Sequence, residues 1–150
     1  MPVADLYGLH WAFGYGRVPD DRSADAAVYL PGRNLLLTMK AALYCAKQRI
    51  PRLAIGVLRG NPFSDSSARF FRQVSDVVQT AVGQRVLIER PLANESKVQV
   101  IRRARGFLLG LSFSCINPHG RQHCGRCNKC AERRRAFRAA GQIDPTPYRA

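Results

Sequence analysis

Apolar residues recur at helical spacing in two stretches of the chain. In the first stretch, which ends before Pro51, the spacing is four, three and four residues, at Leu35, Met39, Ala42 and Ala46. In the second stretch a similar row ends before Gly83, at Phe70, Val74, Val77 and Ala81. Spacings of three and four place such side chains on one face of a helix, so both stretches are predicted to be amphipathic helices.

Short apolar runs follow these predicted helices, at 53–58 and 86–88. Because the run from Leu53 to Leu58 is almost continuously apolar, we expect a strand buried on both faces of a parallel sheet. The alternation of helices and strands is typical of βαβ units. A later apolar run at 108–113 is predicted to be a final strand, which leads into Ser114 and Cys115.

The remaining segments are two basic helices and irregular chain. A helix is expected to open at 94–97, with Val98 and Ile101 facing inward and the arginines at 102, 103 and 105 facing outward. A second basic helix is expected at 128–140, where Gly141 ends it. The first 27 residues predict loop with a short strand or turn, and 144–148 predict an extended tail.

The turn Pro31-Gly32-Arg33-Asn34 precedes the first predicted helix. The start of a helix presents free backbone N–H groups, so an anion could dock there with the help of Arg33. Alternatively Pro31 and Gly32 only turn the chain, and Asn34 caps the helix. The spacing alone favours the second interpretation.

Four cysteines near the end of the chain have the spacing of a metal site. Cys124, Cys127 and Cys130 form two Cys-x-x-Cys steps, and Cys115 lies upstream of them. Such turns aim three sulfur atoms at one centre, and a fourth thiolate completes the tetrahedron that Zn²⁺ prefers. Four thiolates leave no open position on the ion, which is typical of a structural site.

Other interpretations of the cysteines remain open. An iron–sulfur cluster also uses Cys-x-x-Cys steps, and paired disulfides would need an oxidising compartment that the N-terminal sequence does not indicate. We expect His119 and His123 to be loop residues or hydrogen-bond donors around the site. Cys45 stands apart in the first predicted helix and is expected to be a core residue.

The composition adds a strong positive charge to this picture. The chain has 150 residues, a formal net charge of +14 and 46% hydrophobic residues, which is enough for one domain with a core. No apolar run is long enough to span a membrane, so we expect a cytoplasmic protein without membrane contact. The positive charge favours the binding of polyanions such as RNA, or of phosphorylated ligands. One candidate function is therefore a zinc-knuckle module that binds nucleic acid.

Several unlike motifs occur together in one order between Val28 and Pro145. They are Leu30-Pro31-Gly32-Arg33-Asn34, then Ile55-Gly56-Val57 with a loop carrying Asp65, then Ser96-Lys97, and last Ser114-Cys115 with Cys124-Gly125-x-Cys127-x-x-Cys130. In this order the motifs resemble the 7-cyano-7-deazaguanine synthases, the ExsB-like branch of the PP-loop ATPases that act in queuosine biosynthesis.

The resemblance implies an α/β fold with a partial Rossmann-like parallel sheet of the adenine nucleotide alpha hydrolase type. Residues 28–114 would form the α/β core, and 115–150 a zinc knuckle with a helix and tail, in a single domain. This family converts 7-carboxy-7-deazaguanine to the nitrile with ATP and ammonia. The resemblance places Asp65 and Lys97 in the active site as catalytic groups, with a structural Zn²⁺ on the four cysteines. Substrate or nucleotide would bind at Arg33, Asn34 and Gly56.

One family motif does not occur in the sequence. The family binds ATP with a Ser-Gly-Gly-x-Asp-Ser loop, and these 150 residues contain no such stretch. We therefore expect a truncated synthase, one half of a split enzyme, or a degenerate paralogue that is non-catalytic. ATP and Mg²⁺ would bind only if a partner chain with the PP-loop, or a homodimer, supplied the missing part.

Overall fold

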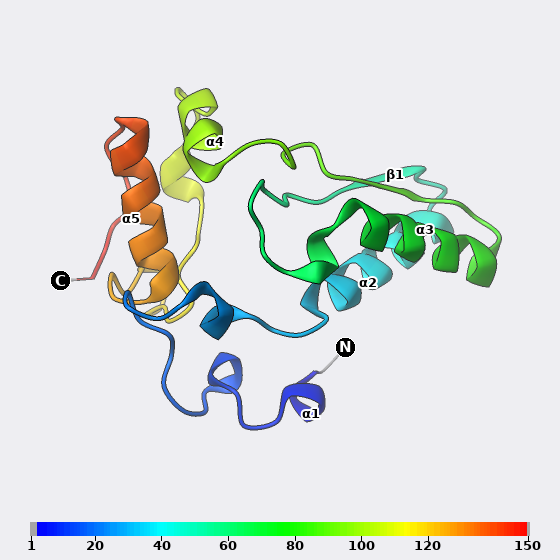
Figure 1. Ribbon diagram of the computed structural model, residues 1–150, viewed down its shortest axis with the longest axis horizontal. Helices are drawn as coiled ribbons and strands as arrows, with labels where there is room; N and C mark the ends of the chain where they lie inside the picture. Colours follow the sequence, from blue (N-terminus) through cyan, green and yellow to red (C-terminus); the bar gives the residue numbers. More distant parts are fainter. Residues whose placement is uncertain (1–2, 150) are drawn as a thin grey trace. The chain divides into compact units, whose positions relative to one another are not determined.

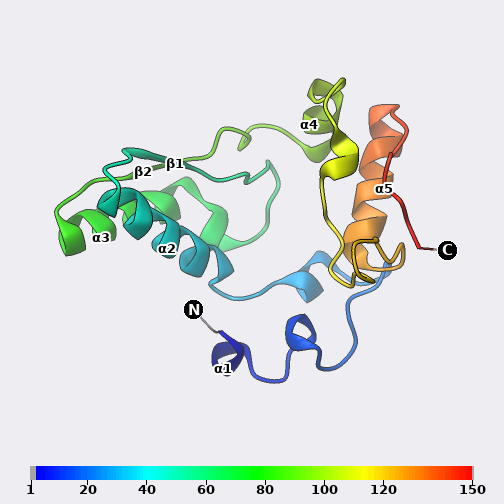
Figure 2. The same cartoon turned by 180° about the vertical axis from the view of Figure 1, so that it is seen from behind.

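The computed structural model describes residues 3–149 and contains two compact units (Figures 1 and 2). Pro31–Lys97 forms the first, which we call the α/β unit. Met1–Leu30 together with Val98–Ala150 forms the second, which we call the cysteine unit. The single-domain organisation expected from the sequence stays a prediction. Within residues 3–149, no helix is both long and apolar enough to cross a membrane.

The α/β unit contains a βαβ arrangement with a parallel sheet, as predicted. Its helices are α2 (Arg33–Lys47) and α3 (Ala68–Val82), and a short 3-10 turn, η3 (Ser64–Ser66), precedes α3. The strands β1 (Arg52–Ala54) and β2 (Leu87–Glu89) run parallel, with Leu53 opposite Ile88. Figures 1 and 2 show α2 and α3 along one side of this two-stranded sheet.

The core of the α/β unit lies between its helices and its sheet. It is made of small and β-branched side chains, and Cys45 belongs to it as predicted: Ala42, Cys45, Ala46, Val78 and Val86, with Met39 and Leu53 packed against them. The inward face predicted for α3 is confirmed at Val74, which is buried, but is one position off elsewhere, because Phe71 is buried while Val77 is 54% exposed. Buried Ser75 donates a hydrogen bond to the Val86 carbonyl at 2.5 Å, which fixes this rotation of the helix.

The expectation of strands buried on both faces is wrong. In each strand the central residue is partly buried against the helices, while the flanking side chains on the opposite face are exposed: Arg52, Ala54, Leu87 and Glu89. Within Pro31–Lys97 the two helices cover one face of the sheet, so the apolar run of β1 is only half covered. Arg52 and Glu89 form an ion pair at 3.3 Å across the exposed face.

The cysteine unit consists of short helical segments and one longer helix. Its first part contains three such turns and no strand in the described residues: α1 (Ala4–Tyr7), η1 (Trp11–Phe13) and η2 (Asp25–Val28). Its second part contains η4 (Leu109–Leu111), α5 (Asn128–Ala140) and all of α4 (Lys97–Arg103) except its first residue, which is the last residue of the α/β unit. The prediction for α5 is confirmed, including its end at Gly141, which adopts a positive φ of 68°.

Helices α4 and α5 pack against each other through a second apolar cluster. Ile101 is buried against α5 residues, and Val98 is partly buried beside it, so the inward face predicted for α4 is confirmed. The α5 residues in this cluster are spaced as one helix face: Ala136, Phe137 and Ala140. Figure 1 shows the two helices side by side.

The strand predicted at 108–113 is wrong, because the segment forms the 3-10 turn η4. Leu108 and Leu111 are 78% and 81% exposed, so most of the apolar pattern does not face a core. The carbonyls of Leu109 and Ser112 instead accept hydrogen bonds from the Arg133 guanidinium, at 3.0 and 3.4 Å. These contacts replace the strand pairing that the apolar pattern suggested.

Candidate metal centre

The four cysteines of the spaced motif lie together in the cysteine unit. Their sulfur atoms all lie within 4.8 Å of one another, and all four residues are buried. Cys115 and Cys127 have their sulfur atoms 3.9 Å apart. One ion with Zn–S bonds of about 2.3 Å in a tetrahedron would hold sulfur atoms roughly 3.8 Å apart, so the four thiols fit a single zinc ion.

The alternatives to one metal ion fit this geometry less well. A disulfide needs sulfur atoms about 2.0 Å apart, and all five cysteines of the chain are free thiols in the structure. A four-iron cluster binds each thiolate to a different iron, so its sulfur atoms lie further apart than ligands of one ion. The arrangement is therefore that of a four-thiolate site for a single soft cation.

Backbone N–H groups point at the sulfur atoms of the cluster. The amides of Asn117 and Cys124 donate to the Cys115 sulfur at 3.4 and 3.3 Å. The amides of Arg126 and Cys127 both donate to the Cys124 sulfur at 3.4 Å. Such donors stabilise a thiolate more than a thiol, so the turn that Gly125 forms with its φ of 72° prepares the site for a cation.

The start of α5 contributes further to the cluster. Cys127 is the N-cap of α5, and Cys130 lies in its first turn. Burial opposes ionisation of Cys127, but backbone donors at Ile116 and Cys130 outweigh it and lower the pKa to about 7. Burial raises the pKa of Cys115 and of Cys130 above the usual range of a thiol. Cation binding would favour the thiolate form of the ligands and release the protons that they still carry.

The two histidines near the cysteines do not reach the metal site as ligands. His123 is buried, and its Nε2 accepts a hydrogen bond from the Ser114 amide at 3.1 Å, next to Cys115. Burial lowers the pKa of His123, and the nearby Arg133 charge lowers it further, so the ring is neutral and can accept. His119 is exposed and lies in a short hairpin with Gln122.

A buried ion pair next to the cluster was not predicted from the sequence. Arg133 donates from Nε to Asp144 at 3.0 Å, and the side chains are only 8% and 11% exposed. Asp144 also accepts from the hydroxyls of Thr146 and Tyr148, both at 2.6 Å. Burial opposes ionisation of Asp144, but these donors together with Arg133 hold its pKa below its ordinary value. The sequence did contain a signal for the burial of Arg133, because this residue follows Cys130 by three positions and therefore lies on the same face of α5.

This ion pair holds the last described segment of the chain over the cysteine turn. Tyr148 lies edge-on against His123, and the Arg149 amide donates to the His123 carbonyl at 2.8 Å. A side chain at Gly125 would meet Tyr148 and the Arg149 carbonyl at 3.7 to 3.8 Å, so the segment closely covers the second cysteine turn. We call residues 144–149 the C-terminal strap.

A segment from the start of the chain reaches the other side of the cluster. Val18 packs against the buried cysteines, and Asp20 forms an isolated antiparallel bridge with Cys127. The Asn128 amide donates to the Pro19 carbonyl at 3.0 Å, which satisfies one of the free N–H groups at the start of α5. The site thus depends on segments from both parts of the cysteine unit.

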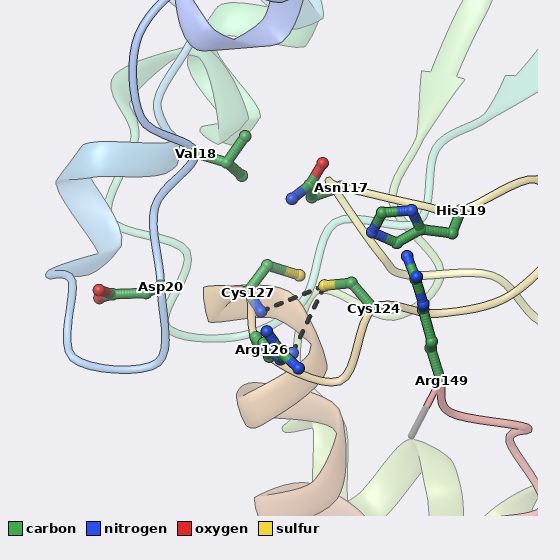
Figure 3. A pocket seen from close by; sticks show the side chains of 8 residues that line it. All are labelled: Val18, Asp20, Asn117, His119, Cys124, Arg126, Cys127 and Arg149. Atoms are coloured by element: carbon green, nitrogen blue, oxygen red, sulfur yellow. Dashed lines mark hydrogen bonds between the residues drawn. The ribbon is translucent and has the colours of Figure 1, made fainter.

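A pocket of about 330 Å³ adjoins the cysteines (Figure 3). It is lined by residues from 18–20, 117–127 and the strap: Val18, Asp20, Asn117, His119, Cys124, Arg126, Cys127 and Arg149. In Figure 3 the guanidinium end of Arg149 lies beside the His119 ring, and the Asp20 carboxylate is turned away from the sulfur atoms. The pocket therefore places basic groups next to the metal site.

The predicted site residues of the α/β unit lie near the carboxyl ends of its strands. Asn34 and Asp65 are both buried, and the Asp65 carboxylate accepts from the Asn34 backbone amide at 3.1 Å and from its side chain at 3.3 Å. The Asp65 carboxylate, rather than the Asn34 side chain, thus accepts a hydrogen bond from a free backbone N–H group at the start of α2. Arg33 is the exposed first residue of α2, and Gly56 follows β1. Their predicted roles stay predictions.

Two contacts that were not predicted join the loops at this edge of the sheet. The Arg59 amide donates to the Glu95 carbonyl at 2.9 Å, so the chain after β1 meets the chain after β2. The Arg90 guanidinium donates to the Ser66 carbonyl at 3.2 Å, next to Asp65. Lys97, two residues after Glu95, is half-buried at the start of α4. Sequence spacing gave no signal for Arg90.

Comparison with known proteins gives one consistent result. Residues 17–141 match the family described as queuosine biosynthesis protein QueC. The 7-cyano-7-deazaguanine synthase of Methanocaldococcus jannaschii is 29% identical, over 81% of this chain and 57% of that protein. The synthase of Methanopyrus kandleri is 30% identical, over 89% of this chain and 65% of that protein. The chain thus spans about three fifths of these relatives, and the matched residues include all four clustered cysteines.

Proposed function

We propose, because this chain belongs to the queuosine biosynthesis protein QueC family, that it forms part of a 7-cyano-7-deazaguanine synthase. The observation that carries the proposal is the family match over residues 17–141, which includes both the sheet of the α/β unit and the four-cysteine cluster. The relatives carry the name of this synthase. These matches do not favour the nucleic-acid-binding alternative.

The reaction in this proposal joins ammonia to a carboxylate and ends in a nitrile. ATP would activate the carboxylate of 7-carboxy-7-deazaguanine by adenylation, and ammonia would displace AMP to give an amide, which is then dehydrated to the nitrile. We assign Zn²⁺ to Cys115, Cys124, Cys127 and Cys130 as a structural ion, because four thiolates leave it no position for substrate.

The proposal assigns the substrate and nucleotide to the carboxyl edge of the sheet in the α/β unit. Ligands of open α/β sheets bind at the carboxyl ends of the strands. Gly56 lies in the segment that follows β1, and Lys97 lies at the end of the segment that follows β2. Lys97 and Arg33 would bind anionic groups there. The Asn34–Asp65 contact would hold the start of α2 in position, with Asp65 close to the reacting groups.

We further propose that synthase activity depends on an ATP-binding loop outside these 150 residues. The 150 residues contain no Ser-Gly-Gly-x-Asp-Ser stretch, and backbone N–H groups of such a loop bind the pyrophosphate of ATP. The zinc-loaded chain should therefore be assayed alone and together with the PP-loop segment of a related synthase. Each assay contains 7-carboxy-7-deazaguanine, ATP, Mg²⁺ and ammonia, and the nitrile is measured by mass spectrometry.

The expected result is nitrile formation only in the mixture, and its loss when Lys97→Ala replaces the native chain. Arg135→Ala is the matched control, because Arg135 is an exposed cation on α5 outside the proposed site. Nitrile formation by these 150 residues alone would contradict the need for a loop outside them. A mixture that binds zinc and folds but makes neither amide nor nitrile would contradict the proposed function.

A further inference from the structure

The pocket beside the cysteine cluster contains two arginine side chains, Arg126 and Arg149, that pair with no carboxylate in the described residues. Within residues 3–149, the guanidinium groups of Arg126 and Arg149 form no hydrogen bond or ion pair with another side chain. Two arginines of α5 near the cluster differ from them. Arg133 is bound to Asp144, and Arg134 donates to the Gly125 carbonyl.

The one carboxylate in the pocket lining is already occupied. Asp20 accepts hydrogen bonds from the Arg22 amide at 3.1 Å and from the Ser23 hydroxyl at 2.9 Å, and it forms an ion pair with Arg17. Figure 3 shows this carboxylate turned away from the cysteine sulfur atoms. Asp20 therefore shapes the wall of the pocket and leaves the charges of Arg126 and Arg149 available.

The thiolates are the competing anions for these arginines. Four backbone amides already donate to the sulfur atoms of Cys115 and Cys124, and a bound Zn²⁺ would offset half of the charge of the four thiolates. Arg126 and Arg149 are exposed, and their guanidinium groups carry five N–H donors each that the sulfur atoms do not use. The pocket thus keeps guanidinium N–H donors that no carboxylate or sulfur atom of its lining uses.

We propose that this pocket binds an oxyanion, namely the phosphate or carboxylate group of a small molecule, between Arg126 and Arg149. Two guanidinium forks suit such groups because each can donate two parallel hydrogen bonds to oxygen atoms. Asn117 and His119 add neutral polar groups to the same wall. The volume of about 330 Å³ lies at the small end of ligand sites, which fits one anionic group with its nearest atoms.

Titration of the zinc-loaded chain tests this proposal. Inorganic phosphate and acetate are added in separate experiments at constant ionic strength, and binding is followed by calorimetry and by the amide NMR signals of residues 117–127. Saturable binding of at least one anion at one site is expected, and the tighter of the two identifies the chemical group. Arg126→Gln and Arg149→Gln should each weaken that binding about tenfold, the cost of one lost charge-assisted contact.

Arg135→Gln is the matched control, because it removes the same charge from an exposed α5 residue outside the pocket lining. It should change the binding constant less than twofold, and the zinc content of every variant verifies that the cluster is intact. Absence of saturable binding for both anions would overturn the proposal, as would equal weakening by all three variants. This result is independent of nitrile formation, so binding can persist even if the proposed synthase function fails.

Discussion

The two units of this chain are stabilised by different interactions. The α/β unit has a contiguous apolar core between α2, α3 and the sheet, which includes Ala42, Val78 and Val86 with little or no exposed surface. The cysteine unit also has an apolar cluster, between α4 and α5, but in addition it buries four cysteines and the Arg133–Asp144 pair. A core of buried thiols needs a cation, whereas an apolar core does not. We therefore expect metal to control the stability of only the second unit.

Metal removal should produce the largest difference between the units. Structural zinc sites supply about 10–16 kcal/mol in small peptides, so a strong chelator is expected to unfold the cysteine turns. Hydrogen exchange measured by mass spectrometry should show loss of protection at 115–131, while α2 and α3 keep theirs. Addition of excess zinc is the control and should restore protection. An equal loss of exchange protection in α2 and α3 would contradict the proposed difference between the two units.

Phe71→Ala should produce the opposite pattern. Phe71 is 1% exposed, and truncation of a buried phenylalanine costs about 3–5 kcal/mol of unfolding free energy. Exchange protection should fall in α2 and α3, while the chain still binds one zinc ion per molecule. Phe107→Ala is the matched control, because Phe107 is 76% exposed and should change stability by less than about 0.5 kcal/mol. Loss of zinc from the Phe71 variant would contradict the separation of the two units.

Acid should weaken the cysteine unit through Asp144. Because the folded-state pKa of Asp144 lies below its ordinary value of 3.8, its contribution is fully present above that value and is lost as the pH falls further. Asp144→Asn removes the charge from the buried pair, so the variant should be less stable than the native chain at pH 7. The difference between the two should shrink below pH 3.8.

Metal ligands also release zinc in acid, so this comparison uses chemical denaturation of the zinc-loaded chains, followed by circular dichroism at several pH values, with the zinc content of both chains measured at each pH. Asp76→Asn is the control, because the Asp76–Arg85 pair is exposed and contributes little. A stability difference between native chain and Asp144→Asn that stays constant from pH 7 to pH 3 would contradict the assigned role of the carboxylate.

The smallest expected effect concerns the start of α3. The Ser67 hydroxyl accepts a hydrogen bond from the Phe70 amide at 3.1 Å as the N-cap of the helix. Ser67→Ala should cost about 1 kcal/mol of unfolding free energy, and Ser67→Asp should retain most of the stability. Urea denaturation, followed by a signal from the α/β unit, measures the unfolding free energy of both variants. Identical midpoints for the alanine variant and the native chain would show that the cap is without effect.

The features that the sequence predicted well are those with a local cause. The end of α5 follows from Gly141, because only a residue tolerant of positive φ closes a helix in that way. The cysteine cluster follows from the Cys-x-x-Cys spacing, since those turns can converge on one centre. The parallel pairing of β1 and β2 follows from the alternation of apolar strands with amphipathic helices.

The features that the sequence did not predict depend on distant partners. The run at 108–113 has the composition of a strand, but the carbonyls of Leu109 and Ser112 bind Arg133 from α5. The covering of β1 on one face depends on which segments pack against it, and an apolar run does not contain that information. The contact between Asn34 and Asp65 joins residues 31 positions apart, so spacing could name both residues without pairing them.

The central claim is that Cys115, Cys124, Cys127 and Cys130 bind one metal ion that stabilises the cysteine unit. Elemental analysis of the purified chain tests it directly, with Cys127→Ser as the variant and Cys45→Ala as the control, because Cys45 lies in the core of the α/β unit. We predict one zinc per chain in the native protein and in Cys45→Ala, and less than one in Cys127→Ser. Unchanged zinc in Cys127→Ser, or no metal in the native chain, would contradict the claim.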